Sequence, residues 1–78
     1  MYYVYILRLN NMNFYTGFSS NLQNRYSEHL GGRVRGTRKQ RPLKLVCFIG
    51  FKIKLKALQF EKYLKTPSGF AFRNKRLI

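Results

Sequence analysis

Tyrosine, arginine and histidine recur at regular intervals between Val4 and His29, in a chain with no aspartate and only two glutamates. Cys47 is the only cysteine, so neither a disulfide framework nor a cysteine-based zinc site can form. The chemistry open to this sequence is therefore that of phenol, guanidinium, imidazole, carboxylate and amide groups. The candidate residues are Tyr5, Tyr15, Arg25, His29, Glu61 and Asn74.

Three predicted helices each place such a group among residues that should pack. In the first helix Leu22, Arg25, Tyr26, His29 and Leu30 follow the spacing of one helical face, which is normally the face turned to the core. In the second, Glu61 lies within the stripe of Ala57, Phe60 and Leu64; in the third, Phe70, Leu77 and Ile78 bracket Asn74. Polar groups among packing residues cost stability in a small domain, so this pattern indicates a functional site.

Each of these residues also has a purely structural explanation when it is considered alone. The alternatives are a core tyrosine for Tyr5 or Tyr15, an ion pair between Arg25 and Glu61, a packed imidazole for His29 and a helix-end residue for Asn74. Glu28 lies outside the stripe, and we expect it to be solvated. The case for function therefore rests on the joint occurrence of the set.

Local patterns predict one domain over residues 1–78, with the element order ββαβαα. Strands are expected at Tyr2–Leu9, Asn13–Gly17 and Leu43–Phe51, the third being the most buried. The first helix is expected to open at a Ser20–Gln23 capping box and end at Gly31-Gly32; a second covers Lys54–Lys65, and a short third one follows Ser68-Gly69 and ends near Arg76. The predicted fold is α+β, a small three-stranded mixed or antiparallel sheet flanked by helices.

The first two strands are predicted to form a hairpin closed over Asn10 to Met12, where asparagine tolerates the left-handed conformation of a tight turn. If Leu9 faces Asn13, Tyr5 opposes Gly17 and Leu7 opposes Tyr15. Both tyrosines then share one face, about 7–8 Å apart and within reach of one phosphate group. Gly17 leaves room for the Tyr5 ring and for a nucleic-acid backbone.

Positive charge dominates the composition, because sixteen Lys and Arg residues against two glutamates give a net charge of +14 and an isoelectric point near 10.7. Such a surface favours polyanionic partners, first nucleic acid and second an anionic membrane. The longest apolar run, Leu45 to Phe51, is well short of the roughly 20 residues that span a membrane. The first residues lack the features of a signal peptide, so we expect no membrane association and a cytoplasmic location.

The sequence resembles the GIY-YIG endonuclease superfamily. The two signature tripeptides stand here as Tyr3-Val4-Tyr5 and Tyr15-Thr16-Gly17, and Arg25 follows ten residues after the second tyrosine, inside NLQNRYSEH. The segments TRKQRPLKLV and ALQFEKYLK look like the small single-domain branch related to the nuclease half of the excinuclease C protein. The likeness covers essentially the whole chain.

The resemblance implies a three-stranded sheet flanked by helices and a divalent-metal-dependent cut of a DNA phosphodiester. It makes Tyr5 and Tyr15 the signature phenols, Arg25 the arginine and Glu61 the metal ligand. His29 stands where relatives carry histidine or tyrosine, and Asn74 looks like the asparagine that follows the glutamate. Phe18 stands where some relatives carry a lysine, so the role of that lysine must be absent or supplied elsewhere.

The scarcity of carboxylates fits a single Mg²⁺ or Mn²⁺ on Glu61, completed by water and phosphate oxygens, better than a two-metal site. Arg25 would hold a non-bridging phosphate oxygen. We assign Tyr5 as the base, with a pKa depressed by the positive surroundings, and His29 as the acceptor of its proton. Tyr15 would orient water or phosphate, although the order of the two tyrosines stays open.

DNA binding is expected to be mostly to the phosphate backbone, with weak sequence specificity, a preference for a DNA structure and any greater selectivity supplied by a partner protein. The segment Arg33–Pro42 has no apolar period and is predicted to be a basic loop that contacts phosphates through Arg33, Arg35, Arg38, Lys39 and Arg41. Two alternatives stay open. One is a non-catalytic nucleic-acid-binding module on the same fold, and the other is a small basic protein associated with ribosomal RNA.

Overall fold

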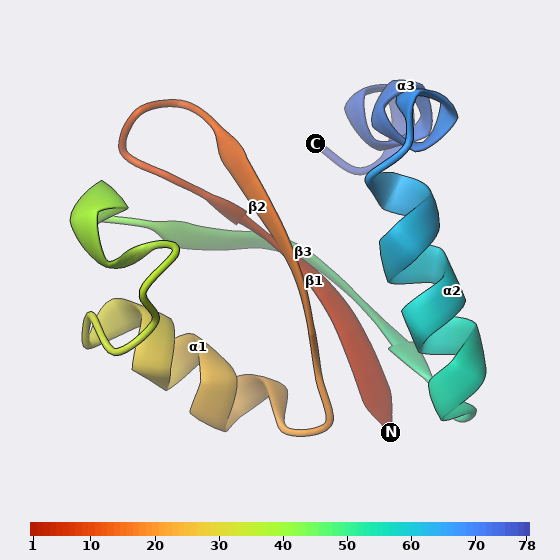
Figure 1. Ribbon diagram of the computed structural model, residues 1–78, viewed down its shortest axis with the longest axis horizontal. Helices are drawn as coiled ribbons and strands as arrows, with labels where there is room; N and C mark the ends of the chain where they lie inside the picture. The colour runs from red at the N-terminus through yellow and green to blue at the C-terminus, as the bar shows by residue number, and fades with distance from the viewer.

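The computed structural model describes all of residues 1–78, as a three-stranded antiparallel sheet in the order β2-β1-β3 with three α-helices (Figure 1). The predicted α+β class is confirmed, and of the two sheet types considered the antiparallel one is found. The elements are β1 (Tyr2–Arg8), β2 (Phe14–Ser19), α1 (Leu22–Leu30), the 3₁₀ turn η1 (Arg38–Gln40), β3 (Lys44–Phe51), α2 (Lys54–Leu64) and α3 (Pro67–Arg76).

The β1–β2 hairpin has the predicted register. Leu9 N donates to Asn13 O over 2.8 Å, Tyr5 pairs with Gly17, and Leu7 pairs with Tyr15. The left-handed residue of the turn is Met12, with φ of 71°, rather than one of the asparagines. Because side chains alternate along a strand, this register places the Tyr5 and Tyr15 rings on the same face of the sheet.

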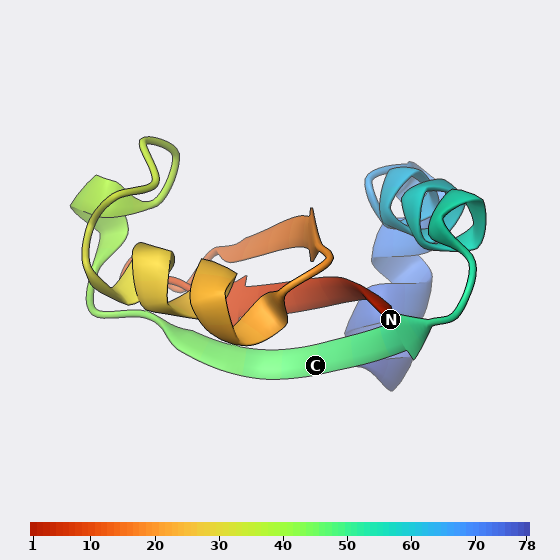
Figure 2. The ribbon, with the colours of Figure 1, turned by 90° about the horizontal axis from the view of Figure 1, so that it is seen from below.

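The central strand β1 separates two hydrophobic clusters. Val4 and Ile6 pack with Ala57 and Leu64, toward α2, whereas the alternate residues Tyr5, Leu7 and Leu9 pack with Leu43, Leu22 and Tyr26, toward α1. The helices thus cover opposite faces of the sheet, and in both views α1 lies at the other end of the molecule from α2 and α3 (Figures 1 and 2).

The prediction that the third strand is the most buried was wrong. Four consecutive residues of β1, Val4 to Leu7, are at most 2% exposed, whereas exposed and half-buried residues alternate along β3. The reason is topological, because β1 has a hydrogen-bonded neighbour on each side and β3 pairs with β1 alone. The apolar run that suggested burial includes Phe48, which is 55% exposed at this edge of the sheet.

The start of α1 also differs from the prediction. Asn21, and not Ser20, caps the helix, because its Oδ1 accepts a hydrogen bond from Asn24 N over 3.0 Å. Gly31 ends the helix as expected. Leu30 was predicted to face inward with its stripe, but it is 48% exposed because it is the last helical residue and lies beyond the sheet contact.

The segment between α1 and β3 is anchored to the protein at two points. Val34 is 8% exposed and Thr37 is fully buried, although the sequence around them is polar and basic. Thr37 N donates to Val34 O over 3.1 Å, which closes a turn just before η1. No α-helix of the chain has the length and hydrophobicity needed to cross a membrane.

Candidate active site

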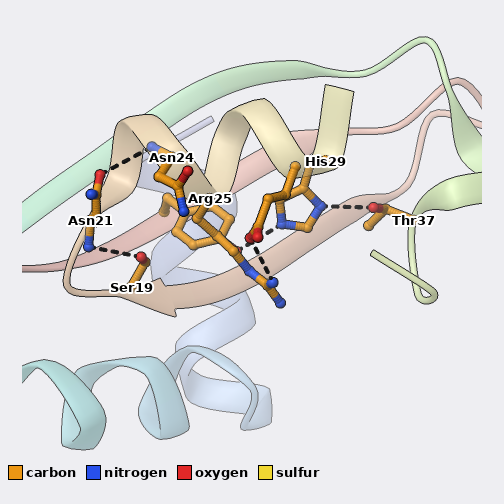
Figure 3. Close-up of polar contacts among 8 residues, drawn as sticks. Ser19, Asn21, Asn24, Arg25, His29 and Thr37 are labelled. Carbon is orange, nitrogen blue, oxygen red and sulfur yellow. Dashed lines mark hydrogen bonds and ion pairs between the residues drawn. The ribbon is translucent and has the colours of Figure 1, made fainter. Parts of the chain in front are cut away.

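Three buried polar side chains, joined by hydrogen bonds, connect the sheet, α1 and the following loop. Tyr5 Oη lies 2.8 Å from His29 Nε2, and His29 Nδ1 lies 2.7 Å from Thr37 Oγ1. Tyr5 is 1% exposed, and His29 and Thr37 are completely buried. Figure 3 shows the His29 ring reaching from α1 to Thr37 on the loop. The imidazole is therefore held at both nitrogens, which fixes its orientation at the centre of the site.

Burial lowers the pKa of His29 from its ordinary value of 6.5, and the positive charge of Arg25 lowers it further, while Glu28 opposes both. The imidazole is therefore neutral at neutral pH, so one ring nitrogen carries a hydrogen and the other is an acceptor. A neutral imidazole beside a phenol can accept the phenolic proton.

The expectation of a depressed Tyr5 pKa was wrong. Burial raises the pKa of this phenol above 10.0, and the charges of Tyr15 and Glu61 raise it further. Arg25, which is close enough for a side-chain hydrogen bond to Tyr5, lowers this pKa but does not outweigh burial. Desolvation penalises the charged phenolate more than one guanidinium favours it. Tyr5 is thus a neutral phenol at neutral pH.

Tyr15 packs against the other two rings of the site. Its ring centroid lies 5.2 Å from that of His29 and 6.3 Å from that of Tyr5, with the His29 contact close to perpendicular. Tyr15 is half-buried, and it comes from β2 at the register position predicted from the hairpin. The three rings pack against one another, and Tyr15 remains partly exposed to solvent.

Arg25 pairs with Glu28, not with Glu61. Its Nη1 lies 3.1 Å from Glu28 Oε1, and both side chains are about one third exposed, at 38% and 34%. The structural Arg25–Glu61 pair that the sequence allowed is therefore absent, and Glu28 is engaged rather than simply solvated. The hydrogen bond to Glu28 raises the pKa of Arg25, and the nearby Tyr5 raises it further. A partly exposed pair of this kind contributes little stability, so the guanidinium can exchange Glu28 for an incoming anion.

Glu61 lies on α2, yet its charge reaches Tyr5 and raises the pKa of that phenol. The carboxylate is 20% exposed, and its Oε2 accepts from Lys65 Nζ over 3.3 Å. Nowhere in the chain do three His, Cys, Asp or Glu side chains gather around a common point. One accessible carboxylate fits a single Mg²⁺ that keeps most of its water, because Mg²⁺ gives up its hydration reluctantly.

Asn74 does not face inward as predicted. It is exposed on α3, where its Oδ1 accepts from Arg73 Nε over 3.1 Å and from Arg73 Nη2 over 3.0 Å. The Arg73 guanidinium in turn lies 5.1 Å from the Phe14 ring centroid and 4.8 Å from that of Phe70. The apolar residues around Asn74 misled the prediction, because Phe70 itself is 46% exposed and covers Arg73.

Five residues were predicted to contact phosphates from the α1–β3 loop, and all of them are exposed: Arg33, Arg35, Arg38, Lys39 and Arg41. Arg41 is partly engaged, since its Nε donates to Arg38 O and its Nη1 to Leu30 O. Gly17, by contrast, is buried against the Tyr5 ring, for which it was expected to leave room. Its burial does not favour the direct contact with a nucleic-acid backbone that was also expected.

Thr37 is the member of the site that sequence reasoning missed. It stands among basic residues in a segment without apolar periodicity, and no motif distinguishes it from a solvated loop threonine. Only its spacing of three from Val34, the one aliphatic residue of the loop, indicates a turn with an inward side.

The largest hollow in the surface, of about 540 Å³, lies elsewhere, between the start of α1 and the β1–β3 side of the sheet. Its lining includes Tyr3, Tyr26 and Phe48 but none of the candidate catalytic residues. The candidate site is thus not an enclosed pocket: Tyr5 and His29 are buried, whereas Tyr15 and Arg25 are partly exposed.

Comparison with known proteins finds relatives over the whole chain. The GIY-YIG catalytic domain matches residues 1–76. A UPF0213 protein of Clostridium perfringens (strain 13 / Type A) is 41% identical over 78 residues, covering 99% of this chain and 80% of that protein. A UPF0213 protein from Limosilactobacillus reuteri (strain DSM 20016) is 36% identical over 67 residues, covering 82% of this chain and 70% of that protein.

The solution NMR structure of a UPF0213 protein from Bacillus halodurans shares the fold. It aligns with a TM-score of 0.62 and 27% identity, over 99% of this chain and 87% of that one. GIY-YIG domains are associated with endonucleases and imply nucleic-acid binding, whereas the name UPF0213 specifies no activity. The chain belongs to the GIY-YIG domain family and, within it, to the small UPF0213 proteins.

Proposed function

We propose that this protein is a divalent-metal-dependent DNA endonuclease with little intrinsic sequence specificity, directed by DNA structure. The observation that carries the proposal is the buried hydrogen bond between Tyr5 and His29, with Arg25 and Glu61 close enough to act electrostatically on the same phenol. Hydrolysis of a phosphodiester uses a phenol and an imidazole that exchange a proton, a guanidinium and a carboxylate, and all four kinds of group act on or contact Tyr5 here.

Arg25 would bind a non-bridging oxygen of the scissile phosphate after turning from Glu28, and would stabilise the charge that grows there. Tyr5 Oη would take a proton from the attacking water while its own proton passes to His29 Nε2, so that no free phenolate has to form in a buried site. Tyr15, which is partly exposed, would orient the water or the phosphate. A Mg²⁺ or Mn²⁺ held by Glu61 would supply positive charge for the leaving oxygen.

The net charge of +14 and the exposed loop cations support binding along the phosphate backbone. Backbone contacts fix position and carry no base information, which agrees with weak sequence specificity. We propose that greater selectivity comes from the shape of a branched or flapped DNA or from a partner protein.

Plasmid cleavage with Mg²⁺ tests the function, with Glu61→Gln as the key variant and Glu28→Gln as a matched control. Glu28 is the only other carboxylate side chain, so each variant removes the same charge. We expect wild-type cleavage that stops with a chelator, a loss of about 100-fold or more in Glu61→Gln, and a smaller loss in Glu28→Gln. DNA affinity, measured in the same buffers, should change little in either variant.

Binding without cleavage by wild type and Glu61→Gln alike, over linear, nicked, branched and flapped DNA and with either Mg²⁺ or Mn²⁺, would identify a non-catalytic binding module. Preference for RNA in direct competition, with no effect of metal, would instead identify an RNA-associated structural protein.

A further inference from the structure

The geometry points to Thr37 as a positioning residue that holds His29 in the tautomer with hydrogen on Nδ1 and a free lone pair on Nε2. Its catalytic consequence rests on the proposed function, but the tautomer itself does not. Thr37 is the only group bonded to Nδ1, at 2.7 Å, and both residues are completely buried, so water cannot replace the hydroxyl without opening the structure.

The direction of these hydrogen bonds follows from the contacts of Tyr5, which binds the other nitrogen of His29. Arg25, which lies near the Tyr5 phenol, carries only donors and cannot accept the phenolic hydrogen. The buried phenolic hydrogen then needs an acceptor, and His29 Nε2, at 2.8 Å, is the acceptor within reach. With Nε2 accepting, the neutral ring must carry its hydrogen on Nδ1, which donates to Thr37 Oγ1.

The opposite arrangement would place the hydrogen on Nε2 and would leave the Tyr5 hydroxyl hydrogen without a protein acceptor in a residue that is 1% exposed. It would also prevent His29 from taking the phenolic proton. An imidazole free in water favours the Nε2–H form, so an acceptor at Nδ1 is needed to reverse that preference. Thr37 Oγ1 is placed to accept the Nδ1 hydrogen, and because a hydroxyl can also donate, the direction is set by the need of the Tyr5 hydroxyl for an acceptor at Nε2.

The sequence contains a single histidine, so the tautomer can be read without ambiguity from the ring ¹⁵N resonances of the labelled full-length protein at neutral pH. We expect a protonated Nδ1 and an unprotonated Nε2 in the wild type and in Thr37→Ser. Thr37→Val keeps the shape but removes the hydroxyl, and it should shift the ring to the Nε2–H form or to a mixture. Thr16→Val, at a buried threonine of β2 whose side chain points to the opposite face of the sheet from Tyr15, should leave the tautomer unchanged.

Cleavage of plasmid DNA supplies the second measurement. Thr37→Val should lower kcat by roughly 10- to 100-fold at unchanged DNA affinity, as is typical for the loss of a partner that orients a catalytic group. Thr37→Ser should restore most of the rate.

A wild-type spectrum with hydrogen on Nε2 would overturn the inference, even if Thr37→Val failed to fold. So would a folded Thr37→Val protein with the wild-type tautomer. Absence of cleavage in every variant would contradict the proposed function and leave the tautomer result to decide the role of Thr37.

Discussion

Gly17 lies directly against the Tyr5 ring: a Cβ on Gly17 would come within 2.9 Å of Tyr5 Cε1, and closer still to Cζ and Oη. The two residues are also partners in the β1–β2 ladder. The absence of a side chain at Gly17 therefore allows the phenol to cross β2 and reach His29.

We predict that Gly17→Ala destabilises the protein by about 1–3 kcal/mol, because the added methyl group must displace a fully packed ring. Gly36→Ala is the control, since a Cβ there would lie 3.9 Å from Tyr15, an ordinary contact, and should change stability by less than about 0.5 kcal/mol. Denaturant unfolding measures both. Equal stability of Gly17→Ala and wild type would contradict the close packing of Gly17 on the Tyr5 ring.

Tyr5→Phe and Tyr15→Phe should differ in both stability and activity. Loss of the Tyr5 hydroxyl leaves buried His29 Nε2 without its partner, which should cost about 1–3 kcal/mol and at least about 100-fold in cleavage rate. Tyr15 is half-buried and makes ring contacts that phenylalanine preserves, so its variant should fold normally and lose less activity. Equal, slight losses of rate in both variants would rule out a phenolic proton path.

The stability of the protein should fall in mild acid because of His29. The pKa of this residue is lowered on folding, so the unfolded chain binds the proton more tightly than the native state does. The contribution is therefore complete above about pH 6.5 and is lost as the pH falls through the folded pKa. Unfolding free energies of wild type and His29→Gln across this range give the effect as their difference. Parallel curves would show that His29 is not buried as a neutral ring.

The same lowered pKa predicts the acid limb of the pH–rate profile. Because His29 must be neutral to accept a proton, the rate should fall only below pH 6.5 as the imidazole becomes protonated. Single-turnover rates at saturating DNA measure this limb. A half-maximal point above 6.5 would contradict a desolvated His29.

Salt dependence of DNA binding should identify the cations that contact phosphates. Arg35→Ala and Lys39→Ala, on the exposed α1–β3 loop, should each reduce the slope of log affinity against log salt by about 0.9 and leave the cleavage rate at saturation unchanged. Lys52→Ala is the control, because this exposed residue belongs to the connection between β3 and α2, and Figure 1 shows that connection at the other end of the molecule from the α1–β3 segment. Equal slopes in all three variants would remove the loop from the DNA interface.

The sequence predicts the hairpin best, because the alternation of residues and the three-residue turn together set its register. The apolar stripe on α1 correctly predicted that His29 faces inward, because helical spacing decides which side chains share a face. The same logic misplaced Leu30 and Asn74, which lie near helix ends where a stripe no longer meets the sheet.

Other features depend on tertiary contacts that no local pattern encodes. The burial of β1 rather than β3 follows from the order of strands in the sheet, and the raised pKa of Tyr5 follows from its desolvation between β2 and α1. The Arg25–Glu61 pair, an alternative that the sequence left open, does not form, because Arg25 pairs with Glu28 three residues away on the same helix. Thr37 joins the site only once the loop has folded back on His29.

The basic loop contains two buried residues, Val34 and Thr37, among exposed cations, and this difference matters for protein engineering. Its basic side chains are exposed, so substitutions there should leave the packing around His29 intact. The two anchored positions have to be kept, since a graft that replaced the whole segment would detach His29 from its only contact on that side. A redesigned loop would therefore need a hydroxyl at position 37 to keep the hydrogen bond to His29 Nδ1.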